Sequence, residues 1–127
     1  MSENILQKII DQKKTKIEKL KLEIDINSLL HAISQKDVFF DFKKKIQTKN
    51  SENKISIIAE IKKASPSAGI LIDNYDPIKI ANIYNDNKST CLSVLTEEDF
   101  FLGNLIHISK IKKKVNLPIP FSYTHLR

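Results

Sequence analysis

Apolar residues recur every three or four positions over residues 4–22, which predicts an amphipathic helix with Ser2 or Asn4 as its cap. A second, short helix is expected to open at Asn27 or Ser28. The N-terminal part of the chain is therefore predicted to be helical.

A third helix is predicted to begin near Asp37, and the polar residues 48–53 are expected to form the loop after it. We assign no chemistry to this helical part, taken as residues 1–54. The apolar face of the third helix is Phe39, Phe42 and Ile46.

The pattern then changes to short apolar runs rich in β-branched residues. Residues 55–62 and 91–96 each predict a strand buried on both faces, and a third strand is expected over 115–119. Residues 65–69 predict a loop after the first strand.

Helical patterns separate these strands. Asp76 and Pro77 predict the cap and first residue of a helix that ends near Asn87, and residues 105–114 predict another. Strands alternating with helices favour a parallel α/β fold. The first strand is not followed by Gly-x-Gly-x-x-Gly, so a (β/α)8 TIM barrel is the preferred prediction. Such barrels need about 250 residues, so we expect this one to be truncated near its third strand.

Composition narrows the function classes. The 127 residues contain no apolar stretch of the roughly 20 residues that a membrane helix needs, and no signal peptide is recognised. The single cysteine, Cys91, indicates a reducing cytoplasm and is interpreted as a small buried hydrophobe. The net charge of +6 comes from 20 lysines and one arginine, which does not favour nucleic-acid recognition. A small basic interaction or nucleic-acid-binding module stays open as the alternative.

The strongest candidate chemistry lies at the end of the first predicted strand. Glu60 and Lys62 are two residues apart and share one face, at the strand end where parallel barrels build their active sites. Ser65 follows in the loop and could donate a hydrogen bond to an anionic substrate. A purely structural ion pair, with a turn-forming serine, is the alternative.

The loop after the second strand is the other candidate. Phe100 and Phe101 could line a flat substrate or pack on the rim, and the acids at 97–99 form a poor metal-ligand set. His31 and His107 are expected on helix surfaces or sides.

Two segments carry a family resemblance. Residues 58–67, Ile-Ala-Glu-Ile-Lys-Lys-Ala-Ser-Pro-Ser, and residues 92–103, Leu-Ser-Val-Leu-Thr-Glu-Glu-Asp-Phe-Phe-Leu-Gly, resemble the signatures of indole-3-glycerol-phosphate synthases. Residues 75–77 and 5–10 also resemble that family, and the likeness covers about residues 4–119. It implies a (β/α)8 barrel with extra N-terminal helices and without cofactor or metal.

The resemblance also implies an activity and its residues. The family closes the indole ring of 1-(2-carboxyphenylamino)-1-deoxyribulose 5-phosphate with loss of carbon dioxide, in tryptophan biosynthesis. Glu60 would belong to the catalytic polar network, and Lys62 would pair with the anthranilate carboxylate. Ser65 would add a hydrogen bond and Phe101 an aromatic wall. The expected partner is this small anionic substrate, with no nucleic acid or membrane; the oligomeric state stays open.

The likeness stops in the third strand. Where the family has Lys-Asp-Phe, with the lysine as general acid, this chain has Ser122, Tyr123 and Thr124. A serine cannot supply that charged proton donor. We therefore expect residues 55–119 to be the first part of the barrel, 120–127 to be an off-pattern tail, and the chain to be inactive alone. Another phosphate-binding barrel, such as phosphoribosylanthranilate isomerase, is the further alternative.

Overall fold

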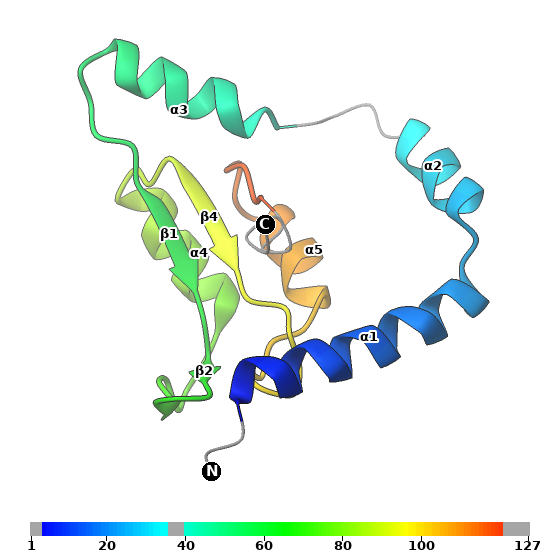
Figure 1. The fold of residues 1–127 in the computed structure, drawn as a ribbon. Coiled ribbons are helices and arrows are strands. Elements are labelled where there is room, and N and C mark those ends of the chain that lie inside the picture. The colour runs from blue at the N-terminus through cyan, green and yellow to red at the C-terminus, as the bar shows by residue number, and fades with distance from the viewer. Residues whose placement is uncertain (1–3, 36–39, 121–127) are drawn as a thin grey trace. The chain divides into compact units, whose positions relative to one another are not determined.

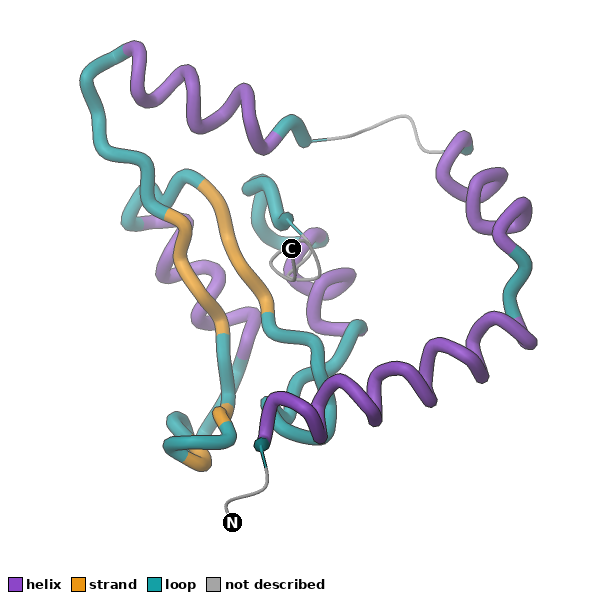
Figure 2. Tube along the Cα trace, viewed as in Figure 1, coloured by secondary structure: helices purple, strands orange, loops and turns teal. Residues whose placement is uncertain are grey.

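The computed structural model describes residues 4–35 and 40–120, traced in Figures 1 and 2. The chain divides into two compact units, Met1–Phe39 and Phe40–Arg127, and each is described by itself. The predicted boundaries at residues 54 and 119 stay predictions. No helix in the described ranges is both long and apolar enough to cross a membrane.

The first unit contains two helices, α1 (Ile5–Glu23) and α2 (Ile26–Ser34). Asn4 caps α1, as predicted, by accepting a hydrogen bond from the Leu6 backbone N–H at 3.1 Å. The predicted start of α2 at Asn27 or Ser28 is wrong. The Asp25 carboxylate accepts both of those backbone N–H groups, at 3.1 and 3.0 Å, so the helix opens directly after Asp25. These hydrogen bonds, that to Asn27 foremost, lower the pKa of Asp25.

Helix α3 (Phe42–Ser51) opens the second unit and is capped by Asp41, which accepts from the Lys44 N–H at 2.8 Å. The predicted start at Asp37 and the side chain of Phe39 lie outside the described residues. The predicted loop over 48–53 is wrong for its first four residues, which are helical.

The late end of α3 has a local cause. Asn53 adopts a left-handed φ of 54°, and the Lys54 N–H reaches back to the Lys49 carbonyl oxygen at 3.0 Å. This arrangement satisfies the last helical carbonyls, and asparagine tolerates the left-handed conformation it requires.

Two parallel strands form the centre of the second unit, β1 (Ile58–Ile61) and β4 (Cys91–Val94). They pair from Ile58 opposite Cys91 to Ile61 opposite Val94. Helix α4 (Pro77–Asp86) makes the crossover between them (Figure 1). The predicted cap is confirmed, because Asp76 accepts from the N–H groups of Ile78 and Lys79 at 2.9 and 3.0 Å. The predicted parallel α/β pattern is thus present over this unit.

The core lies on one face of this strand pair. Alternate residues of β1 are buried, with Ala59 and Ile61 inside, whereas Ile58 is 48% exposed. The prediction that β1 is buried on both faces is therefore wrong, because Ile58 and Glu60, which share the opposite face of the strand, are exposed. All of β4 is buried, as predicted. The core cluster is Ala59, Ile61, Ala81, Leu92, Val94, Ile108, Ile111, Val115 and Leu117.

The segment after α5 (Ile106–Lys112) does not form the predicted third strand. It lies beside β4, since the Leu92 N–H donates to the Pro118 carbonyl oxygen at 2.9 Å, but no ladder continues. In an extended segment the backbone groups of alternate residues point to the same edge. Since the carbonyl of residue 118 points toward β4, the backbone nitrogens of residues 118 and 120 point there as well. Both are proline and lack an N–H, so the parallel ladder cannot extend.

The predicted loop over 65–69 contains a small antiparallel hairpin, made by β2 (Ala64–Ser65) and β3 (Gly69–Ile70). Gly69 turns the chain with a φ of +68°, a conformation that glycine adopts without steric cost. The Leu71 N–H then donates to the Lys63 carbonyl oxygen at 2.8 Å and closes the hairpin onto the end of β1.

Candidate active site at the end of strand β1

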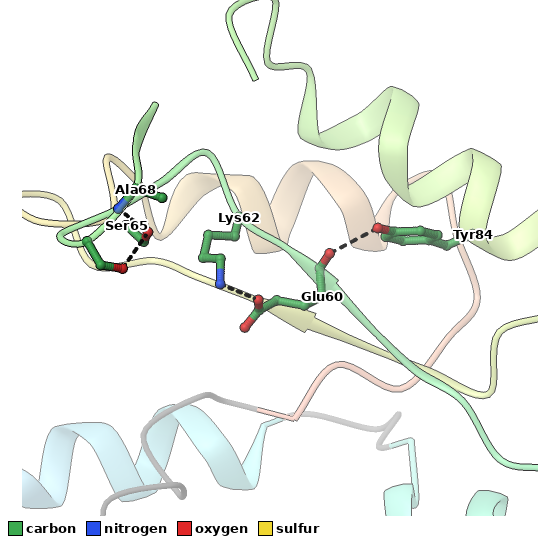
Figure 3. Close-up of polar contacts among 6 residues, drawn as sticks. Glu60, Lys62, Ser65, Ala68 and Tyr84 are labelled. Atoms are coloured by element: carbon green, nitrogen blue, oxygen red, sulfur yellow. Dashed lines mark hydrogen bonds and ion pairs between the residues drawn. The ribbon is translucent and has the colours of Figure 1, made fainter. Parts of the chain in front are cut away.

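Glu60 and Lys62 form an ion pair at the C-terminal end of β1 (Figure 3). Lys62 Nζ lies 2.8 Å from Glu60 Oε2, so the prediction that the two side chains share one face is confirmed. The Glu60 side chain is 48% exposed and that of Lys62 is 29% exposed. Both groups are held by the strand yet remain reachable from solvent.

An ion pair at this exposure stabilises a fold by only about 0–1 kcal/mol. The ammonium of Lys62 also has three donors, and Glu60 engages one of them. Two N–H donors are therefore left to bind a second carboxylate. The geometry is compatible with anion binding, and equally with the structural ion pair considered above.

Two further residues lie next to Glu60. The Tyr84 hydroxyl, from α4, donates to the Glu60 backbone carbonyl oxygen at 3.1 Å (Figure 3). On the other side, Ser93 of β4 is the register partner of Glu60 and therefore shares its face. Sequence reasoning missed both residues, because each contact joins positions more than twenty residues apart.

Ser65 lies beyond the ion pair, in the β2–β3 hairpin. Its Oγ accepts from the Ala68 N–H at 3.2 Å (Figure 3). It also lies 3.5 Å from the Ser67 hydroxyl. The turn-forming role is thus present. The hydroxyl proton is engaged at most by the long Ser67 contact, so it can still be given to a ligand.

Phe101 is half-buried in the loop that leaves β4. This loop starts beside the end of β1, since the Leu95 N–H donates to the Ile61 carbonyl oxygen at 3.0 Å. The candidates on the two loops thus rise from the same edge of the strand pair. Sequence reasoning treated Glu97 only as one of three acids, whereas its carboxylate accepts three backbone N–H groups of this loop.

Tyr75, just before α4, and His107 of α5 form a half-buried aromatic contact, with ring centroids 5.7 Å apart. The Tyr75 hydroxyl and His107 Nδ1 are both buried without a hydrogen-bond partner among the described residues. Burial raises the pKa of Tyr75. Burial, followed by the charges of Lys110 and Lys63, lowers the pKa of His107. The prediction of a helix-side histidine is confirmed, but its partial burial was not foreseen.

Cys91 is fully buried, as predicted, and this burial raises the pKa of its thiol. A groove of about 520 Å³ lies elsewhere, between α3 and residues 116–118, and none of the four predicted site residues lines it. Within residues 4–35 and 40–120, no three His, Cys, Asp or Glu side chains gather as metal ligands would.

The family model described as indole-3-glycerol phosphate synthase matches residues 6–122. An indole-3-glycerol phosphate synthase of Desulforamulus reducens is 40% identical over 115 residues, 91% of this chain and 42% of the relative. Proteins of the same name from Alkaliphilus metalliredigens and Campylobacter jejuni are each 38% identical over 91% of this chain.

This chain spans 43% and 44% of those last two relatives, so it corresponds to less than half of their length. The match nevertheless includes both the Glu60–Lys62 strand end and the Phe101 loop, and it covers nearly all of the described residues. The chain belongs to the indole-3-glycerol phosphate synthase family.

Proposed function

We propose that this chain provides the substrate-carboxylate side of an indole-3-glycerol-phosphate synthase active site. The reaction is the ring closure and decarboxylation of 1-(2-carboxyphenylamino)-1-deoxyribulose 5-phosphate, so the enzyme is a carbon–carbon lyase. One observation carries the proposal: the Glu60–Lys62 pair stands at the C-terminal end of a parallel strand in a chain of this family.

The proposed fold follows from the same strand pair. A parallel β1–α4–β4 unit is the repeating element of a (β/α)8 barrel, and such barrels place their active sites at the C-terminal ends of the strands. In a closed barrel Ile58, Glu60 and Lys62, which share one face, would face the interior. This placement supports a substrate role for the two charged residues.

The proposed roles follow from the donors each group has left. Lys62 uses its remaining N–H donors to hold the carboxylate of the substrate's anthranilate ring. Glu60 keeps the ammonium at the strand end and belongs to the polar network around the reacting atoms. Ser65 adds a hydroxyl donor from the hairpin, and Phe101 supplies an apolar wall for the aryl ring. The partner is a small anionic substrate that bears a phosphate.

Anthranilate is a suitable probe because it is the aromatic carboxylate portion of the substrate. Titration calorimetry should show binding to the chain, weakened about tenfold or more by Lys62→Ala, since a hydrogen-bonded charge pair is lost. Lys63→Ala is the matched control, because it removes the same charge at the next residue, in the bend between β1 and β2. Equal losses from both variants would show that only general electrostatic attraction is involved.

Turnover is tested by completing the protein. The chain should be co-expressed with the remaining C-terminal portion of the Desulforamulus reducens relative, and indole-3-glycerol phosphate formation followed. Product that disappears with Lys62→Ala but persists with Lys63→Ala supports the proposal. Product formation that is insensitive to Lys62 would refute the assigned role.

A further inference from the structure

In the loop after β4, several backbone N–H groups donate hydrogen bonds to one side chain, that of Glu97. Its Oε2 accepts the N–H groups of Phe100 at 2.7 Å and Phe101 at 3.2 Å, and its Oε1 accepts that of Asp99 at 3.2 Å. The backbone carbonyl oxygen of Glu97 also accepts the Gly103 N–H at 2.7 Å. One residue thus organises the whole loop from both its side chain and its main chain.

The rest of the loop has the shape that this arrangement requires. Leu102 adopts a left-handed φ of 51°, which is costly for a leucine and persists only where the surroundings impose it. Gly103 packs directly on the end of β4, where a Cβ would overlap the Leu95 carbonyl oxygen and lie 2.9 Å from the Thr96 carbonyl carbon. The loop is therefore pressed tightly against the strand end.

The hydrogen bonds of the Glu97 carboxylate indicate that it holds the loop backbone. Three consecutive N–H groups share its two oxygens, so those oxygens are engaged before any ligand arrives. An ionised carboxylate is the strongest acceptor available for such donors. The last of the three N–H groups belongs to Phe101, the proposed aryl wall, so the hydrogen bond fixes the backbone that carries its ring.

We propose that Glu97 is a positioning residue, whose carboxylate holds the 97–103 loop and thereby sets Phe101 for the aryl ring of the substrate. The substrate part of this inference rests on the proposed function. The loop part stands on the hydrogen bonds alone. Two separate measurements can therefore test the two parts.

Amide hydrogen exchange tests the loop. In Glu97→Ala, exchange at Asp99, Phe100 and Phe101 should accelerate about tenfold or more, because charge-assisted acceptors are lost. Glu97→Gln keeps one acceptor oxygen and should fall between Glu97→Ala and the unmodified chain. Glu98→Gln removes the neighbouring exposed charge and serves as the control. Slow exchange in β4 in every variant checks that the fold is kept.

Anthranilate titration tests the consequence for the ligand. Affinity should fall several-fold in Glu97→Ala, less in Glu97→Gln, and not in Glu98→Gln. Unchanged exchange in Glu97→Ala overturns the loop assignment, and accelerated exchange with unchanged affinity overturns the positioning of Phe101. If the unmodified chain does not bind anthranilate, the substrate part fails together with the proposed function, while the exchange data still decide what holds the loop.

Discussion

The Tyr84 hydroxyl donates to the Glu60 carbonyl oxygen at 3.1 Å, on the edge of β1 that faces away from β4. The carbonyl oxygens of Ile57 and Ile61 accept from β4, so the alternating backbone directs that of Glu60 to the opposite edge. A helix side chain thus satisfies an acceptor that would otherwise be open, at the residue proposed for catalysis.

Tyr84→Phe should therefore lower the free energy of unfolding by about 1 kcal/mol, the usual net value of one hydrogen bond. Tyr75→Phe is the matched control, because the Tyr75 hydroxyl is buried without a partner among the described residues. Its removal should be neutral or stabilising. Urea denaturation measures both variants, and equal losses would show that the Tyr84 contact contributes nothing specific.

The stability of the chain should depend on pH through His107. Burial first, then Lys110 and Lys63, lowers its pKa from the ordinary value of 6.5, so the folded state resists protonation. The unfolded chain takes up that proton as the pH falls through 6.5, which favours unfolding. Stability from this group is therefore fully present above about pH 6.5 and is lost as the pH falls toward the lowered folded pKa.

Urea midpoints at pH 7.5 and 5.5 would measure this loss, and His107→Gln, which cannot titrate, should reduce it. His31→Gln is the control, because His31 lies exposed on α2. If the pH dependence remained in His107→Gln and disappeared in His31→Gln, it would come from His31, and the prediction would be wrong.

Gly103→Ala should destabilise the chain by about 1–3 kcal/mol, because the new Cβ would overlap the Leu95 carbonyl oxygen at the end of β4. Gly69→Asn is the comparison. Gly69 has a left-handed φ, and a Cβ at this position would meet nothing within 4 Å. Asparagine tolerates that φ, so a change within about 0.5 kcal/mol is expected. Thermal melts of the two variants would measure both changes. Similar losses in the two variants would contradict the steric explanation for Gly103.

Local signals explain which elements could be predicted from the sequence. Asp76 and Pro77 specify the start of α4 by themselves, and the two-residue period of a strand places Glu60 and Lys62 on one face. The prediction of a third strand was wrong because strand pairing there depends on which edge of the segment faces β4. That edge carries the two proline nitrogens, which cannot donate. The role of Glu97 depends on a folded-back loop, which charge and spacing do not reveal.

The Glu60–Lys62 pair gives a test in which stability and binding separate. Both side chains are partly exposed, so Glu60→Gln and Lys62→Ala should each change the free energy of unfolding by less than about 1 kcal/mol. Their effects on anthranilate affinity should have opposite signs. Lys62→Ala removes the cation that holds the carboxylate and weakens binding. Glu60→Gln keeps an acceptor oxygen for the ammonium of Lys62 but removes a like charge near the bound carboxylate, so it should tighten binding.

Turnover should not follow affinity in these variants. In the protein completed by co-expression, Glu60→Gln should lower kcat/KM although it binds the probe more tightly, because a group that serves the reacting atoms contributes more in the transition state than in the ground state. Lys62→Ala should lower both the affinity for anthranilate and kcat/KM. If Glu60→Gln weakened the probe as Lys62→Ala does, Glu60 would act only by holding the ammonium in place, and its role would be positional.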